Sequence, residues 1–112
     1  MSKTTALQES IIEGNNLIAE FMKWVGHPNE VPRYDAEWLY LMPVVEKIET
    51  FERDDEDAEG GYSVMIEGYL CGIENMLGGS ISEGFEDTKI MSVWVAIVKF
   101  IQWYNTNNGS NL

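Results

Sequence analysis

Two long segments in the first half of the chain repeat their apolar residues at helical spacing. In the first, from about Thr5 to Val25, apolar side chains recur every three or four positions with acidic side chains between them, which predicts an amphipathic helix. Its weak helix formers Gly14-Asn15-Asn16 predict a break or a fresh start. The second segment, 36–49, follows Asp35, a residue type that often caps helices. It contains Pro43, which predicts a kink or two abutting helices.

The period changes from helical to alternating in the second half of the chain. Apolar residues alternate with other residues over 64–66 and again over 71–73, on either side of Gly68. This pattern predicts two short strands, with a bulge or a tight turn at the glycine. The glycines and serines over 78–84 predict a further exposed connection.

The last predicted helix, from Lys89 to about Tyr104, is apolar around most of its circumference. Either Asp87 or Thr88 is expected to cap it. An apolar arc this wide exceeds what one face of a sheet can cover. Either the helix therefore lies at the centre of the fold, or a second chain covers part of it, for which a symmetric homodimer is the expected assembly.

Together these elements predict an α+β fold, in which a small antiparallel β-sheet packs against about three α-helices and the C-terminal helix is the most buried. The 112 residues are expected to form a single domain, 1–112, with an acidic loop at 52–61 and a polar tail at 105–112. No stretch approaches the roughly eighteen apolar residues of a membrane span, and no secretory signal is evident. With one cysteine, Cys71, these features favour the cytoplasm.

The charge balance of the chain is strongly acidic. Nineteen acidic residues face seven basic ones, which gives a formal net charge of −12. Direct binding of nucleic acid is disfavoured, because phosphate contacts need clustered Lys and Arg. A negative field instead attracts basic surfaces, including the grooves with which other proteins hold RNA or DNA. The alternative is that the acidity only keeps the protein soluble.

The acidic residues are densest between Glu46 and Glu59, where eight of fourteen residues are acidic. This segment either imitates a polyanion in a site built for phosphates or is a solvated loop whose charges repel one another. A calcium site is a third alternative, because the spacing over 55–60 matches the start of an EF-hand loop, but the acid at the twelfth position is missing. We expect no metal and no cofactor. Five carboxylates are the candidate partner contacts: Asp54, Asp55, Glu56, Asp57 and Glu59.

Catalytic residue types are scarce, whereas residues favoured at protein interfaces are common. His27 and Cys71 are the sole residues of their types and lie in different kinds of segment, so no nucleophile–base pair is indicated. Phosphate-binding glycine motifs, nucleophile elbows and zinc-type spacings are absent from the sequence. Tryptophan is a favoured interface anchor, which makes Trp38 and Trp103 candidate partner contacts. We expect a binding protein and not an enzyme.

Three segments resemble a widespread group of small proteins of unknown function from bacterial genomes, prophages and mobile elements. They are 15–22 (NNLIAEFM), 38–49 (WLYLMPVVEKIE) and 89–105, which closes on Phe-Ile-Gln-Trp-Tyr-Asn, and they cover about a third of the chain. The group has no catalytic motif, and its prophage context implies roles such as countering host defence. In size and charge the chain is also similar to anti-CRISPR proteins.

What the resemblance implies is an inhibitor that binds and blocks an RNA-guided nuclease, with the RNA-targeting type VI class as the first candidate. The partner would then be a basic, nucleic-acid-handling protein. The alternative is a small adaptor or regulatory protein of a mobile element with no role in defence.

Overall fold

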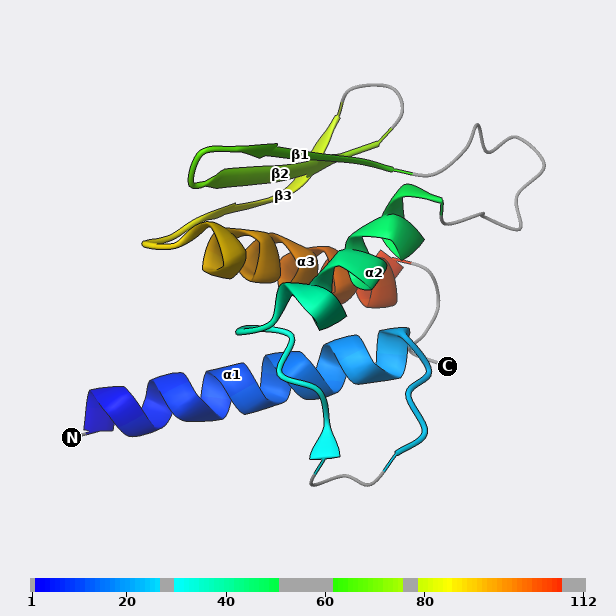
Figure 1. Ribbon diagram of the computed structural model, residues 1–112. Helices are drawn as coiled ribbons and strands as arrows, with labels where there is room; N and C mark the ends of the chain where they lie inside the picture. Colours follow the sequence, from blue (N-terminus) through cyan, green and yellow to red (C-terminus); the bar gives the residue numbers. More distant parts are fainter. Residues whose placement is uncertain (1, 27–29, 51–61, 76–78, 108–112) are drawn as a thin grey trace.

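The computed structural model describes residues 2–26, 30–50, 62–75 and 79–107. In these residues the elements follow the order α1 (Ser2–Phe21), α2 (Trp38–Glu49), β1 (Ser63–Glu67), β2 (Leu70–Glu74), β3 (Ser80–Phe85) and α3 (Lys89–Asn107). The three strands form one antiparallel sheet in the order β1-β2-β3. The sheet lies over α3, α1 lies on the opposite side of α3, and α2 lies beside them (Figure 1). The predicted α+β class is confirmed.

The helix α3 is the central element of the fold. It contacts β2 and β3 on one side and α1 and α2 on others (Figure 1). Its buried side chains are Ser92, Val93, Trp94, Ala96, Ile97, Phe100 and Ile101. None of the large hydrophobic side chains described on α3 is exposed. The wide apolar arc is thus covered within one chain and requires no second copy, while the homodimer stays a prediction.

The strands β1 and β2 form the predicted hairpin, closed by a tight turn at Gly68. Gly68 has a φ of 62°, a left-handed conformation that glycine adopts at no steric cost. Alternation along β2 points Cys71 and Ile73 toward the helices, where both are fully buried.

The segment 78–84, predicted as an exposed connection, instead contains most of β3, which corrects that prediction. Two small residues let β3 lie against α3. The Ser82 hydroxyl donates a hydrogen bond to the Ala96 carbonyl at 2.8 Å. A Cβ on Gly84 would lie 2.0 Å from the Ser92 carbonyl oxygen, so only glycine permits this approach. Small residues that mark loops elsewhere are therefore packing residues here.

The helix α1 runs without interruption through Gly14-Asn15-Asn16, where the composition predicts a break. Gly14 faces α3, and a Cβ on it would lie 2.3 Å from a ring carbon of Trp94. Asn15 is buried and hydrogen-bonded. The predicted break is wrong because close packing against α3 outweighs the low helix propensity of these residues.

The helix α1 ends at Phe21, before the predicted end at Val25. The N–H of Trp24 donates to the Ala19 carbonyl, and the N–H of Lys23 donates to the Glu20 carbonyl. Lys23 has a left-handed φ of 58°. This is a Schellman motif, which satisfies carbonyls that the helix end leaves unpaired.

The helix α2 begins at Trp38 and passes through Pro43 as one helix, so the alternative of two abutting helices is wrong. Its N-cap is Glu37, which makes no side-chain cap. Asp35, predicted as the cap, lies in the preceding turn.

The N-cap of α3 is Thr88, whose hydroxyl accepts a hydrogen bond from the Met91 N–H at 3.2 Å. Within the described residues, no helix is both long enough and apolar enough to cross a membrane.

Candidate protein-binding surface

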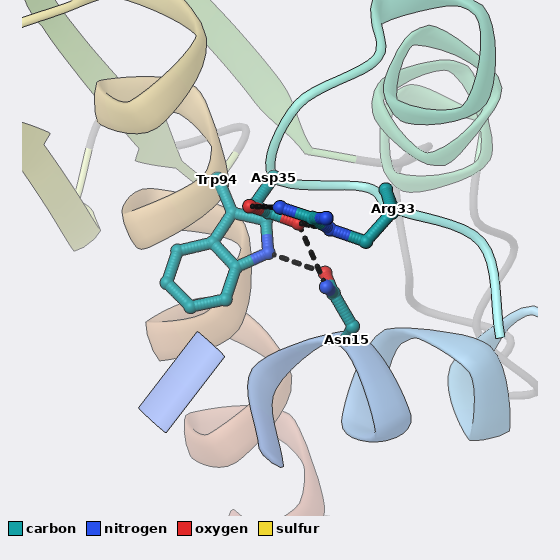
Figure 2. Close-up of polar contacts among 4 residues, drawn as sticks. All are labelled: Asn15, Arg33, Asp35 and Trp94. Carbon is teal, nitrogen blue, oxygen red and sulfur yellow. Dashed lines mark hydrogen bonds and ion pairs between the residues drawn. The ribbon is translucent and has the colours of Figure 1, made fainter. Parts of the chain in front are cut away.

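A cluster of polar side chains joins α1, α3 and the connector before α2 (Figure 2). The Asp35 carboxylate accepts a hydrogen bond from Asn15 Nδ2 at 2.8 Å and two from Arg33 at 2.9 Å each. The Asn15 Oδ1 accepts one from Trp94 Nε1 at 2.9 Å. Four side chains from three separate parts of the chain thus form one continuous network.

This network stabilises the fold and offers little to a ligand. The pKa of Asp35 is lowered, chiefly because Arg33 donates hydrogen bonds to its carboxylate. Burial acts in the opposite direction and raises this pKa, whereas the hydrogen bond from Asn15 lowers it further. Asp35 therefore stays ionised and paired near neutral pH. In the described part of the chain, no buried side-chain polar atom lacks a partner. No acid, base or nucleophile of the network is left over for chemistry.

The sequence offers two further candidate catalytic residues, Cys71 and His27. Cys71 is fully buried, and burial raises the pKa of its thiol to about 11, so the nucleophilic thiolate is scarce at neutral pH. His27 lies outside the described residues. Among the residues that the structure does describe, no group of three or more His, Cys, Asp or Glu side chains could hold a metal ion.

The outer sheet face is the side of the sheet turned away from the helices, and no helix covers it among the described elements (Figure 1). Because side chains alternate along a strand, pairing assigns these residues to it: Ser63, Met65, Glu67, Leu70, Gly72, Glu74, Ser80, Glu83 and Phe85. Several of them are large and exposed, with exposed fractions of 52% for Met65 and 72% for Phe85. Exposed apolar side chains gathered on one face are typical of an interaction surface.

The middle of the outer sheet face is hollow. Gly72 lies on the central strand, and a Cβ added to it would meet nothing within 4 Å. The hollow has a volume of about 420 Å³ and is lined by side chains from all three strands, including Met65, Leu70, Glu74 and Glu83. This volume lies within the range of about 300–1,000 Å³ of small binding pockets.

The outer sheet face is also acidic. It carries the carboxylates of Glu67, Glu74 and Glu83, and no Lys or Arg occurs on the strands. Between Asp54 and Thr88 the chain has ten acidic residues and no basic one. The ion pair found among the described residues, Arg33–Asp35, lies elsewhere. Among the described residues, apolar side chains and carboxylates without an ion-pair partner therefore share one surface that no described helix covers.

The five acidic candidates from the sequence, Asp54, Asp55, Glu56, Asp57 and Glu59, lie outside the described residues. In the sequence they fall between α2 and β1, which is one of the two edge strands of the sheet. Their role in binding stays a prediction.

The two candidate tryptophans have different surroundings. Trp38 is 38% exposed at the start of α2 and adjoins further exposed side chains, Leu39, Tyr40 and Met42. Trp103 is half-buried, and its ring centroid lies 5.9 Å from that of Phe100 and 6.2 Å from that of Tyr62. Trp38 is the more available of the two for a partner, since Trp103 already packs against the core.

Sequence reasoning missed the outer sheet face as a candidate site. The alternation that predicts strands over 64–66 and 71–73 also implies that Met65 and Gly72 point away from the core. This alternation is the signal in the sequence that could have indicated the outer sheet face. Glu83 and Phe85 could not be added to this face, because β3 was expected to be a connection.

Comparison with known proteins gives no further information about the site, since no family model, curated protein or solved structure matches this chain.

Proposed function

We propose that this protein is a non-catalytic binding protein that attaches to a basic, nucleic-acid-handling protein and blocks its nucleic-acid site. The observation that carries the proposal is the outer sheet face, where exposed apolar side chains lie together with carboxylates that have no ion-pair partner among the described residues. A basic groove is complementary to this face in charge. The apolar side chains supply the contact area that protein interfaces need in addition to charge.

The resemblance of three segments to prophage proteins directs the first test to RNA-guided nucleases, with the type VI class first. These enzymes hold their guide duplexes in positively charged channels. Carboxylates placed along such a channel compete with phosphates for the same Lys and Arg side chains. Direct binding of nucleic acid is not proposed, because a net charge of −12 repels phosphate. We propose the cytoplasm as the compartment, where such nucleases act.

The test is inhibition of a purified nuclease, measured together with displacement of its labelled RNA. We expect cleavage to fall as the protein is added, and the RNA to be excluded from the channel. The association rate should drop steeply as salt rises, since exposed charges are screened over about 8 Å at physiological ionic strength. Inhibition that leaves the RNA bound, or that salt does not weaken, would contradict competition for the nucleic-acid site.

The contribution of the acidic loop is tested separately. Joint replacement of Asp54, Asp55, Glu56 and Asp57 by their amides should weaken inhibition if the loop extends the acidic surface next to β1. Unchanged inhibition would restrict the interface to the described surface, including the outer sheet face and Trp38.

The alternative of a mobile-element adaptor predicts a different outcome. No nuclease is then inhibited, and affinity capture from the natural host, analysed by mass spectrometry, recovers a partner without a role in defence. The absence of catalysis is a further part of the proposal. His27→Ala should leave inhibition unchanged, and a loss of inhibition in this folded variant would revive an enzymatic role.

A further inference from the structure

Gly72 is surrounded by two apolar and two acidic side chains on the outer sheet face. Pairing places Met65 and Glu83 beside it on the neighbouring strands, at Cα separations of about 4.5–5.5 Å in antiparallel sheets. Leu70 and Glu74 flank it along β2, each about 7 Å away by the rise of a strand. Because glycine has no side chain, the four neighbours enclose a hollow that is floored by the backbone of β2.

The chemistry around this hollow is amphipathic. One side, formed by Met65 and Leu70, is apolar, and the other side carries the carboxylates of Glu74 and Glu83. Glu67 adds a third carboxylate to the rim. A side chain that fills such a hollow needs an apolar stem and a cationic end with several hydrogen-bond donors.

We propose that the hollow over Gly72 receives an arginine side chain of the basic partner, an inference that rests on the proposed function and names its recognition site. The aliphatic stem of the arginine lies on Met65 and Leu70. Its planar guanidinium, with five N–H donors, bridges Glu74 and Glu83 in charge-assisted hydrogen bonds. Lysine fits less well, because its ammonium is a strongly hydrated point charge that cannot bridge two carboxylates in a fixed plane.

Charge complementarity selects this occupant over the others that an uncovered sheet face attracts. A second copy of the chain brings a net charge of −12 and a sheet without Lys or Arg. Two such faces repel each other. A purely apolar segment would fill the hollow but leave the neighbouring carboxylates desolvated and without partners, which is unfavourable.

The deciding variant is Gly72→Leu, which fills the hollow with the chain's own side chain. The backbone at Gly72 is not in the left-handed region, and a Cβ there meets nothing within 4 Å. The variant is therefore expected to fold, which denaturant unfolding checks. Glu74→Gln/Glu83→Gln removes the two carboxylates but keeps the hollow. Its matched control is Glu13→Gln/Glu20→Gln, which removes the same charge from exposed positions on α1.

The probe is a short peptide of alternating arginine and glycine, compared with its lysine counterpart and titrated into the ¹⁵N-labelled protein. We expect the arginine peptide to shift the amide signals of Met65, Gly72 and Glu83, and to bind several-fold more tightly than the lysine peptide. Gly72→Leu and Glu74→Gln/Glu83→Gln should each weaken this binding roughly tenfold. The α1 control should weaken it by much less.

Several results would overturn the arginine site. One is that the arginine peptide shifts no amide signals on the outer sheet face. Others are that the two peptides bind with equal affinity, or that Gly72→Leu binds the arginine peptide as tightly as the wild type. Equal weakening by the sheet and α1 variants would also overturn it, because only general charge attraction would remain. Failure of the proposed function is distinguishable, since nuclease inhibition is measured without the peptides. Inhibition that survives Gly72→Leu would leave the function standing and remove the arginine site.

Discussion

Replacing Asp35 by alanine removes the acceptor that ties the connector before α2 to α1. The Asp35 residue is 8% exposed and accepts hydrogen bonds from both Asn15 and Arg33. Asn15 is buried, so its Nδ2 donor loses the partner that the structure gives it. Arg33 has a side chain that is 65% exposed, and its guanidinium returns to water when the carboxylate is removed.

These two consequences differ in magnitude. A buried donor left without a partner costs about 1–3 kcal/mol. An ion pair with a solvent-exposed partner contributes about 0–1 kcal/mol. Asp35→Ala should therefore lower the free energy of unfolding by about 1–4 kcal/mol, a large share of the roughly 5–15 kcal/mol typical of a domain. Arg33→Gln should lower it by less than about 1 kcal/mol.

The effect of Asp35 also depends on pH in a defined direction. Its pKa in the folded protein is lowered, chiefly by hydrogen bonding from Arg33. The stabilisation is therefore complete above the ordinary aspartate pKa of about 3.9 and is lost as the pH falls through the lowered folded value. The difference between the wild type and Asp35→Ala should be largest at neutral pH and should shrink at acid pH, because protonation removes the charge that Arg33 pairs with.

Urea unfolding followed by tryptophan fluorescence at neutral and acid pH measures both effects, with free energies obtained by linear extrapolation. The structural reasoning is refuted if Asp35→Ala and Arg33→Gln destabilise equally at neutral pH. It is also refuted if the deficit of Asp35→Ala persists unchanged at a pH where the carboxyl group is protonated in both states.

Three further predictions concern packing and reactivity. Gly14→Ala should destabilise the protein by about 1–2 kcal/mol in urea unfolding, because the clash with Trp94 exceeds the helix-propensity gain of about 1 kcal/mol. Its control is Gly72→Ala, where the added Cβ meets open space. That variant should leave the free energy of unfolding unchanged or raise it by up to about 1 kcal/mol. Cys71 should react with a thiol reagent only when the protein opens or unfolds, since its side chain is fully buried and burial also raises the pKa of its thiol to about 11; rapid labelling of the native protein would contradict its placement. Trp103→Ala should cost about 1–3 kcal/mol from lost ring packing, and no change in stability would place that ring outside the core.

The elements set by periodicity could be predicted from the sequence. The apolar pattern of 89–104 gave the central helix, and the alternation on either side of Gly68 gave the β1–β2 hairpin, because each pattern reflects burial on a continuous surface. The acidic loop is also predicted from the sequence, but it lies outside the described residues.

The elements set by tertiary contact could not be predicted in this way. In the sequence, Gly14 and Asn15 have the composition of a helix break. In the fold, Gly14 permits the close approach of α3, and Asn15 forms hydrogen bonds with both Trp94 and Asp35. Gly84 likewise indicates a loop until the backbone of α3 is placed beside it. Since β3 was missed for this reason, the outer sheet face, which needs all three strands, was missed with it.

The central claim is that the carboxylates of the outer sheet face bind a basic partner. The most direct measurement compares the dissociation constant of the captured partner for Glu67→Gln/Glu74→Gln/Glu83→Gln, the sheet variant, with that for Glu13→Gln/Glu20→Gln/Glu30→Gln, the control variant. Both variants have the same net charge, and the control positions are exposed and away from the sheet. We predict a loss of tenfold or more for the sheet variant and a small loss for the control variant. Equal losses, or none in the sheet variant, would contradict the claim.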